Sequence, residues 1–273
     1  MTIILCGGGS GGHITPLLAV AKELKKQNPD LKLIGLCEKK SRFAHLLKDS
    51  SLIDEVYQVR AGKLRRYAGR SWLSRLVDFR TLFFNVRDSL YVLRGYSQSR
   101  RLLKRLKPDG IFIKGGFVGA PVGIAARRLH IPFITHDSDS VPGLANRIIA
   151  RWALLHATGM PAEYYTYPKD RTVFTGTPVS ADFKQVDDQL RQSYRESLGL
   201  QDCKTVIAII GGSQGAGQLN ESIVAIIGQL MQQSEGLGVL HIVGEIHKEF
   251  MLKAYKAELL ADELKRVVIE GFV

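Results

Sequence analysis

Two glycine-rich turns, about two hundred residues apart, each follow an apolar stretch and precede a helix-like one. The first runs from Gly7 to His13 and the second from Gly211 to Ala216. Glycines at such a corner let the backbone turn sharply and approach a ligand without a Cβ in the way. The helix that follows points unpaired N–H groups and the positive end of its dipole at the turn, which favours an anionic oxygen. The pair of turns therefore predicts two α/β domains that grip an anionic ligand from both sides of a cleft.

Short β-branched stretches alternate with helical ones, a pattern typical of parallel sheets. In the first half we expect strands at 2–6, 32–37, 55–59, 110–114 and 133–136, and helices at 17–26, 41–48, 121–129 and 143–153. In the second half we expect strands at 172–175, 205–210, 239–243 and 267–270. A stretch rich in Pro, Tyr and Gly at 158–177 marks a junction, so the expected domains are 1–160 and 171–273. Four strands are fewer than a doubly wound domain usually has, so we expect the second domain to be incomplete.

Cysteine usage and hydropathy bear on the compartment. The three cysteines, Cys6, Cys37 and Cys203, fall in or beside expected buried strands, which is typical of reduced core thiols in a cytosolic protein. The apolar stretch after Met1 is only one strand long, so no secretory signal is expected, and no stretch is long enough to span a bilayer.

The first turn matches the dinucleotide fingerprint, with glycines at positions 7, 9 and 12, and Glu38 stands where a ribose-binding acid would follow the second strand. A nicotinamide-dependent oxidoreductase is thus one interpretation. Two features disfavour it: nearly every position of the turn is glycine, and His13 follows at the helix N-terminus, where a titratable group would face the cleft. We interpret His13 as a general base or a hydroxyl-orienting partner.

Two further strand ends bear chemistry. Lys114 precedes Gly115-Gly116, and Asp137-Ser138-Asp139 ends the strand at 133–136. Because the carboxyl ends of parallel strands meet at one edge of a sheet, His13, Lys114 and Asp137 are expected to face one another. The Asp-x-Asp pattern also resembles the metal site of some glycosyltransferases, but three residues match it easily by chance, so no metal or cofactor is expected.

The excess positive charge of the chain is confined to one segment. Between Arg60 and Lys107 lie fourteen basic and two acidic residues, a difference that equals the net charge of +12 for the whole chain. Aromatic and aliphatic residues alternate with the arginines, partly at helical spacing. The composition describes a helix on an anionic membrane surface or a nucleic-acid patch. No nucleic-acid module accompanies it, so we favour the membrane.

Taken in order, several motifs of the chain resemble those of the MurG-type glycosyltransferases, which have the GT-B fold. They are Gly7–Pro16, Lys114–Pro121, the segment from His136 that ends with Pro142-Gly-Leu-Ala-Asn146, Gly176–Val179, and Gly211–Ala216 followed by Leu219-Asn220. The resemblance covers nearly the whole chain. It implies two Rossmann-type domains facing a cleft and transfer of N-acetylglucosamine from UDP-GlcNAc to an undecaprenyl-diphosphate-linked muramyl-pentapeptide.

The resemblance also implies roles for individual residues. Ser10, Gly11, Gly12 and His13 match the loop beside the acceptor diphosphate, with His13 as a candidate catalytic base; Asp137, from its place at a strand end, is the other candidate. The other residues expected to bind substrate are Lys114, Asp139, Asn146, Ser213, Gln214, Gly215 and Asn220. The chain departs from the family at Asp137-Ser138-Asp139, where Glu-Gln-Asn is usual, and at Ser180, where an arginine is usual. The family elements for uracil, ribose and the donor sugar are expected beyond Val273.

We therefore expect an inverting, metal-independent hexosyltransferase on the cytoplasmic face of the membrane, converting lipid I to lipid II in peptidoglycan synthesis. The alternatives are a glycosyltransferase for another lipid-linked sugar, an oxidoreductase, or a non-catalytic membrane-associated remnant.

Overall fold

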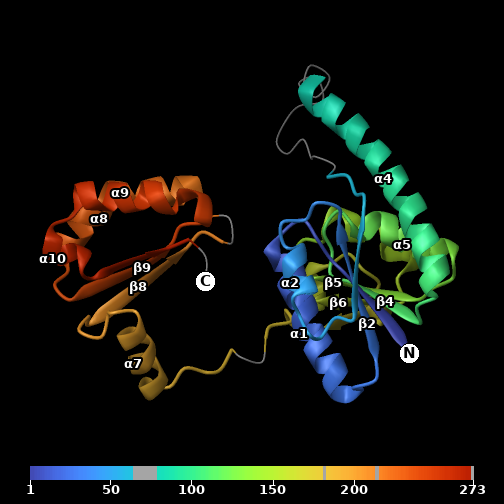
Figure 1. Ribbon diagram of the computed structural model, residues 1–273, viewed down its shortest axis with the longest axis horizontal. Coiled ribbons are helices and arrows are strands. Elements are labelled where there is room, and N and C mark those ends of the chain that lie inside the picture. The colour runs from blue at the N-terminus through green and yellow to red at the C-terminus, as the bar shows by residue number, and fades with distance from the viewer. Residues whose placement is uncertain (64–78, 181–182, 213–214, 272–273) are drawn as a thin grey trace. The chain divides into compact units, whose positions relative to one another are not determined.

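The computed structural model of the chain describes residues 1–63, 79–180, 183–212 and 215–271. The chain forms two compact units, Met1–Phe183 and Lys184–Val273 (Figure 1). The boundary between them comes later than the junction expected at 158–177. The reason is that the stretch after residue 154 adds two more strands to the first sheet, including the strand expected near 172, which we had assigned to the second half.

The first unit is built on one parallel sheet with the order β3-β2-β1-β4-β5-β6-β7. Its strands are β1 (Thr2–Cys6), β2 (Lys32–Glu38), β3 (Glu55–Val59), β4 (Gly110–Ile113), β5 (Phe133–Asp137), β6 (Leu155–Thr158) and β7 (Thr172–Phe174). Strand order reverses between β1 and β4, because β2 and β3 extend the sheet on one side of β1 and the later strands extend it on the other. Ligands of such folds bind at the carboxyl ends of the strands beside this switch point.

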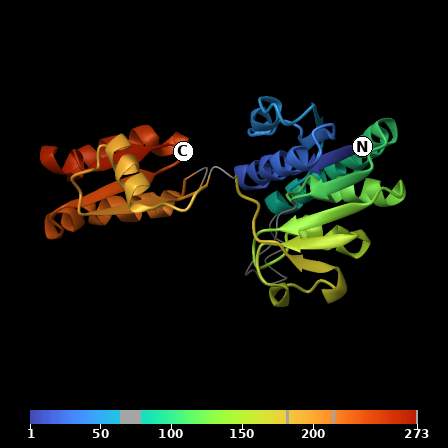
Figure 2. The same ribbon diagram turned by 90° about the horizontal axis from the view of Figure 1, so that it is seen from below.

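Helices cover both faces of this sheet (Figure 2). One face packs against α1 (Gly11–Gln27) and α2 (Ala44–Lys48), and the other against α4 (Phe79–Leu106), α5 (Gly119–Arg128) and α6 (Leu144–Ile149). Strand β1 contributes to both cores, because successive side chains of a strand point to opposite faces. Ile4 and Cys6 join the core on the side of α4, α5 and α6, whereas Leu5 joins the core on the side of α1 and α2.

Helix α1 begins six residues earlier than the apolar pattern predicts. The pattern starts at Leu17, but the helix starts at Gly11, inside the glycine-rich turn. Ser10 has an extended backbone and precedes it without a side-chain cap. The first turn of α1 is therefore formed by residues of the glycine-rich turn. The N–H groups of this first turn have no partner within the helix and point toward the glycine-rich turn.

Helix α4 accounts for the last part of the basic segment and reaches well beyond the sheet in Figure 1. Among its described side chains, Val86, Leu90 and Leu93 are more than half exposed. Their spacing of four and three residues places them on one face, which continues along the helix with exposed Arg94, Arg101 and Lys104. Residues 64–78, on which much of the expected membrane segment falls, lie outside the described residues. No helix in the described part of the chain combines the length and hydropathy that crossing a bilayer requires.

The second unit contains a parallel sheet with the order β10-β9-β8. Its strands are β8 (Thr205–Ile210), β9 (Leu237–Ile242) and β10 (Val267–Glu270), and its helices are α7 (Asp188–Ser197), α8 (Gly217–Gln233), α9 (Lys248–Glu258) and α10 (Ala261–Leu264). Buried side chains of α8 and α9 form a core with the sheet. The described residues thus give this unit three strands, one fewer than expected, because the strand near 172 belongs to the first sheet.

Candidate functional site

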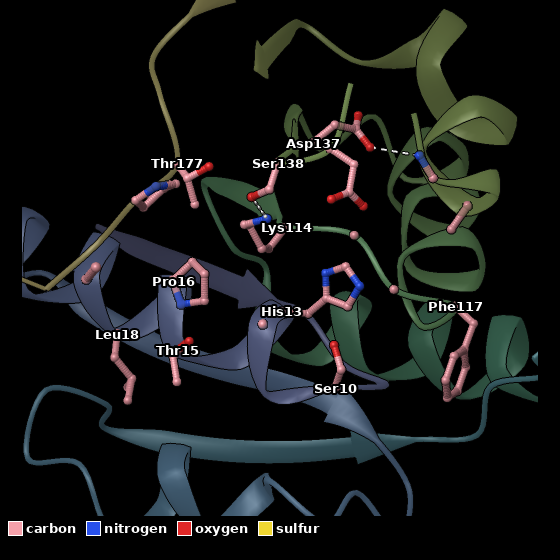
Figure 3. A pocket seen from close by; sticks show the side chains of 18 of the residues that line it. Ser10, His13, Thr15, Pro16, Leu18, Lys114, Phe117, Asp137, Ser138 and Thr177 are labelled. Atoms are coloured by element: carbon pink, nitrogen blue, oxygen red, sulfur yellow. Dashed lines mark hydrogen bonds between the residues drawn. The ribbon is translucent and has the colours of Figure 1, made fainter. Parts of the chain in front are cut away.

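A cavity of about 1270 Å³ opens in the first unit where β1, β4 and β5 end. Six of the predicted site residues line it: Ser10, Gly12, His13, Lys114, Asp137 and Asp139. Figure 3 shows His13, Lys114, Ser138 and Asp137 gathered at these strand ends. The convergence of His13, Lys114 and Asp137 expected from the parallel topology is thus present in the structure.

The glycine-rich loops 7–13 and 114–117, both in this unit, touch through their backbones. A Cβ on Gly116 would collide with the carbonyl group of Gly8, and the φ of Gly116 is 77°. Glycine is therefore required at position 116 on both counts. The carboxylate of Glu38 accepts a hydrogen bond from the N–H of Gly9 at 3.1 Å and is 9% exposed. Glu38 thus supports the loop, which removes the ribose-binding acid on which the oxidoreductase interpretation depends.

His13 lies in the first turn of α1, and its ring lies against the loop 114–117. A Cβ placed on Gly115 would lie 3.6 Å from Cε1 of the ring. Burial lowers the pKa of His13 below its ordinary value, and the positive charge of Lys114 lowers it further, while the carboxylates of Asp139, Asp137 and Glu38 oppose both effects. Nδ1 is buried and has no hydrogen-bond partner among the described residues. Because His13 is half-buried and lines the cavity, its lowered pKa leaves a neutral imidazole at the cavity wall.

Lys114 follows β4 and is only 2% exposed. Its Nζ donates a hydrogen bond to the hydroxyl of Ser138 at 2.8 Å (Figure 3). Burial lowers the pKa of Lys114, whereas the charges of Asp137 and Asp139 raise it. Because Ser138 is neutral, the hydrogen bond leaves the ammonium charge uncompensated at short range, so Lys114 favours an anion in the cavity.

Asp137 is the last residue of β5, and both oxygens of its carboxylate are engaged. Oδ1 accepts a hydrogen bond from the N–H of Gly143 at 2.9 Å, and Oδ2 accepts one from the hydroxyl of Tyr167 at 2.8 Å. Asp139, by contrast, is exposed. Within the described residues, no group of three or more His, Cys, Asp or Glu side chains is placed to hold a metal ion. Tyr167 belongs to no motif, so sequence reasoning did not identify it.

Two predicted residues of the first unit lie behind the cavity. Gly11 is buried in the first turn of α1. Asn146, in α6, is completely buried, and its Nδ2 donates a hydrogen bond to the carbonyl group of His136 at 3.0 Å. His136 in turn holds the chain near the end of the unit, because its Nε2 lies 2.9 Å from the carbonyl oxygen of Gly176. These residues support the loops that form the cavity.

The second glycine-rich turn belongs to the other unit. Ser213 and Gln214 lie outside the described residues. Gly215 has a φ of 74° and approaches the carbonyl group of Val243, which a Cβ would strike. Asn220, in the first turns of α8, is buried and donates a hydrogen bond from Nδ2 to the same carbonyl group at 3.0 Å. Both residues thus fix the turn against the end of β9.

Comparisons with known proteins agree with the motifs. Residues 3–157 match the glycosyltransferase family 28 N-terminal domain. The UDP-N-acetylglucosamine–N-acetylmuramyl-(pentapeptide) pyrophosphoryl-undecaprenol N-acetylglucosamine transferase of Lachnospira eligens is 32% identical over 252 residues, covering 89% of this chain and 62% of that protein. The protein of the same name from Clostridium botulinum (strain Loch Maree) is 33% identical, over 96% of this chain and 70% of its own length.

Solved structures show the same fold. The crystal structure of Acinetobacter baumannii MurG matches with a TM-score of 0.61 and 25% identity, over all of this chain and 66% of that one. UDP-GlcNAc 2-epimerase from Neisseria meningitidis matches with a TM-score of 0.59 at 15% identity, over 98% of this chain and 71% of that one, which shows likeness of fold alone. The GT-B-like α/β fold and the resemblance to MurG-type enzymes predicted from the motifs are confirmed.

The share of each protein that is matched decides whether the family of this chain is established. The chain spans 62% of the length of several of the curated relatives it matches. The family model nevertheless covers more than half of the chain, and two relatives at least 30% identical are matched over two thirds of their length or more. The chain belongs to glycosyltransferase family 28.

Proposed function

We propose that this chain provides the acceptor site and part of the donor site of an enzyme that transfers N-acetylglucosamine from UDP-GlcNAc to an undecaprenyl-diphosphate-linked muramyl-pentapeptide. The observation that carries the proposal is the cavity at the switch point, where a buried lysine and a partly buried histidine meet two glycine-rich loops. The names of the relatives supply the donor and the acceptor.

In the proposed reaction, His13 is the base. Its imidazole takes the proton from the acceptor hydroxyl, whose oxygen attacks the anomeric carbon as the bond from that carbon to the UDP oxygen breaks. UDP leaves with the electron pair, and the configuration at the anomeric carbon inverts. We choose His13 over Asp137 because the lowered pKa keeps His13 neutral at pH 7, whereas both oxygens of Asp137 already accept hydrogen bonds.

The negative charge that develops on UDP would be stabilised in the second unit. The turn Gly211–Ala216 precedes α8, and the N-terminus of that helix offers N–H groups and the positive end of its dipole. Ser213, Gln214, Gly215 and Asn220 are the residues we assign to the donor. Charge stabilisation of this kind needs no metal, so we expect a chelator to leave the rate unchanged.

Lys114 is proposed to bind the diphosphate of the acceptor. Replacing it with methionine keeps the length of the side chain and removes the charge. A hydrogen bond to a charged group is worth about 1.5–3 kcal/mol, so affinity for a short polyprenyl diphosphate should fall by about ten- to a hundredfold.

The same substitution should leave the melting temperature unchanged or raise it, because burying an unpaired charge destabilises the free protein. Calorimetric titration and thermal unfolding of Lys114→Met measure the two effects. Weaker binding accompanied by a large loss of stability would mean that Lys114 has a structural role.

The pH dependence of transfer should report the pKa of His13. Since burial and Lys114 lower that pKa below 6.5, and the neutral form acts as the base, the rate should stay constant down to pH 6.5 and fall only below it. Removing the positive charge with Lys114→Met should raise the pKa and move this acidic limb to higher pH. A rate-against-pH series for both proteins measures the limb. A limb centred above pH 6.5 in the unsubstituted protein would contradict the assignment.

We also propose that α4 places the enzyme on the cytoplasmic face of the membrane. Supporting this, Val86, Leu90 and Leu93 form an exposed apolar face that continues into basic residues, and Val92 of the same helix lines the cavity. A lipid-linked acceptor would then reach the cavity from the surface on which the helix lies. The nucleic-acid interpretation has no comparable support, so no nucleic-acid partner is proposed.

The proposal is tested by supplying the complete gene product with labelled UDP-GlcNAc and a lipid-linked muramyl-pentapeptide. We expect labelled disaccharide to form on the lipid, with or without chelator. UDP-glucose as donor and a lipid diphosphate bearing another sugar as acceptor serve as controls. Transfer only to the other sugar would favour a different lipid-linked acceptor, and no transfer to any lipid would refute the proposed function.

A further inference from the structure

Two buried tyrosines contact the end of β5 and the loop that follows it. Tyr165 and Tyr167 follow β6, are 7% and 8% exposed, and have parallel rings with centroids 6.0 Å apart. Both hydroxyls reach the loop, but they contact different groups. Tyr165 donates to the backbone carbonyl groups of Asp139 at 2.7 Å and of Asp137 at 3.5 Å, whereas Tyr167 donates to the side chain of Asp137. Only Tyr167 therefore acts on a carboxylate that lines the cavity.

Both oxygens of the Asp137 carboxylate accept hydrogen bonds, and the two donors come from separate segments of the chain. Tyr167 holds Oδ2 at 2.8 Å, and the N–H of Gly143, which precedes α6, holds Oδ1 at 2.9 Å. Two contacts on opposite oxygens fix the rotation of the group, which one contact would leave free. The charge of the fixed carboxylate favours the protonated forms of Lys114 and His13, since it raises the pKa of both.

The sheet itself fixes the position of Tyr167. The ring of His156, from β6, stacks on the Tyr167 ring with centroids 4.0 Å apart and planes at 11°. His156 is completely buried, and its Nδ1 lies 2.8 Å from the hydroxyl of Thr135 in β5. Burial lowers the pKa of His156, as does the charge of Arg171, so the stacked ring is neutral. Residues of the neighbouring strands β5 and β6 thus position the Tyr167 ring, and the hydroxyl of Tyr167 in turn positions the Asp137 carboxylate.

We propose that Tyr167 is a positioning residue of the acceptor site: its hydroxyl fixes the carboxylate of Asp137 and acts on the cavity only through that carboxylate. The inference rests on the proposed function, which makes this cavity the acceptor site. Burial of the ring alone would explain a phenylalanine at this position equally well. The hydrogen bond of the hydroxyl to a charged side chain is what the proposal explains.

The first test uses the chain itself and requires no activity. In Tyr167→Phe the ring and its stacking on His156 remain, but the carboxylate can rotate away from Gly143. Hydrogen exchange of the Gly143 amide, followed by NMR, should accelerate by about tenfold. Tyr165→Phe is the matched control, because it removes an equally buried hydroxyl from the adjacent stacked ring and should leave Gly143 unchanged. In an Asp137→Ala background, Tyr167→Phe should have no further effect. Unchanged exchange in Tyr167→Phe, or equal acceleration in both phenylalanine variants, would overturn the proposal.

The second test measures transfer by the complete gene product. Tyr167→Phe should lower kcat by about tenfold through misplacement of the acceptor, and the variant that combines it with Asp137→Ala should be no slower than Asp137→Ala alone. Faster Gly143 exchange with unchanged kcat would overturn the role in the site. An unsubstituted protein without transfer activity would refute the proposed function, and the exchange rates would still decide whether Tyr167 fixes Asp137.

Discussion

Replacing His13 with glutamine should slow transfer by about 10²–10⁴-fold, the usual cost of losing a positioned base. Glutamine retains a polar group at the helix N-terminus, so the loop should keep its structure. Donor affinity should stay within about twofold, because we assign UDP-GlcNAc to the turn and helix of the second unit. Single-turnover rates together with UDP-GlcNAc titration separate the chemical step from binding.

A second histidine provides the control for this experiment. His45 is exposed, lies near the carbonyl oxygen of Arg42, and does not line the cavity. His45→Gln should therefore transfer at the unsubstituted rate. If His13→Gln kept more than about a tenth of the rate, another group would have to accept the proton, and Asp137→Asn would be the next variant to measure.

Removing the charge from the basic face of α4 should weaken membrane binding by about a thousandfold. Each basic residue near an anionic surface contributes about 1 kcal/mol, so neutralising Arg94, Arg100, Arg101 and Lys104 removes about 4 kcal/mol. The unsubstituted chain should sediment with phosphatidylglycerol vesicles at low salt and leave them as salt shortens the Debye length. Vesicles of phosphatidylcholine alone should bind little of either protein.

The control variant changes the same number of charges elsewhere. Lys39, Lys40 and Arg42, which precede α2, and Lys48, its last residue, are all exposed and lie outside the basic segment. Converting these four to glutamine should have a much smaller effect on vesicle binding than the α4 variant. Equal losses in the two variants would show that overall net charge, and not the α4 face, drives association. Binding of the unsubstituted chain to double-stranded DNA as tight as to vesicles would favour the nucleic-acid interpretation.

The apolar pattern of the sequence predicts the bounds of most strands closely. β1, β3, β8 and β10 have the expected bounds, and β2, β4 and β5 differ by one residue, because short β-branched stretches bounded by turns have few alternatives. β7 shows the limit of this approach. Its three residues are partly or largely exposed, and nothing in their composition indicates which sheet they join. Membership was decided by pairing with β6, a long-range contact that a local pattern does not contain.

The candidate site likewise contains residues that the sequence predicts and residues that it does not. His13, Lys114 and Asp137 follow three strands of one sheet, so topology alone brings them together. Tyr167 could not be found by this argument, because it lies thirty residues beyond Asp137 in a stretch without a motif. The start of α1 was missed because glycine disfavours helix in isolation. In the folded unit, Ile14 and Leu17 pack on the sheet and stabilise the helical turn that precedes them.

The backbone contact between Gly8 and Gly116 has a consequence for protein engineering. Grafting the first glycine loop from a relative with a different acceptor would place a foreign backbone against Gly116, where no Cβ fits. The segments 7–13 and 114–117 therefore form one exchangeable module, although a hundred residues separate them. Chimeras that swap both together should remain folded more often than those that swap one, and random libraries should hold position 116 fixed.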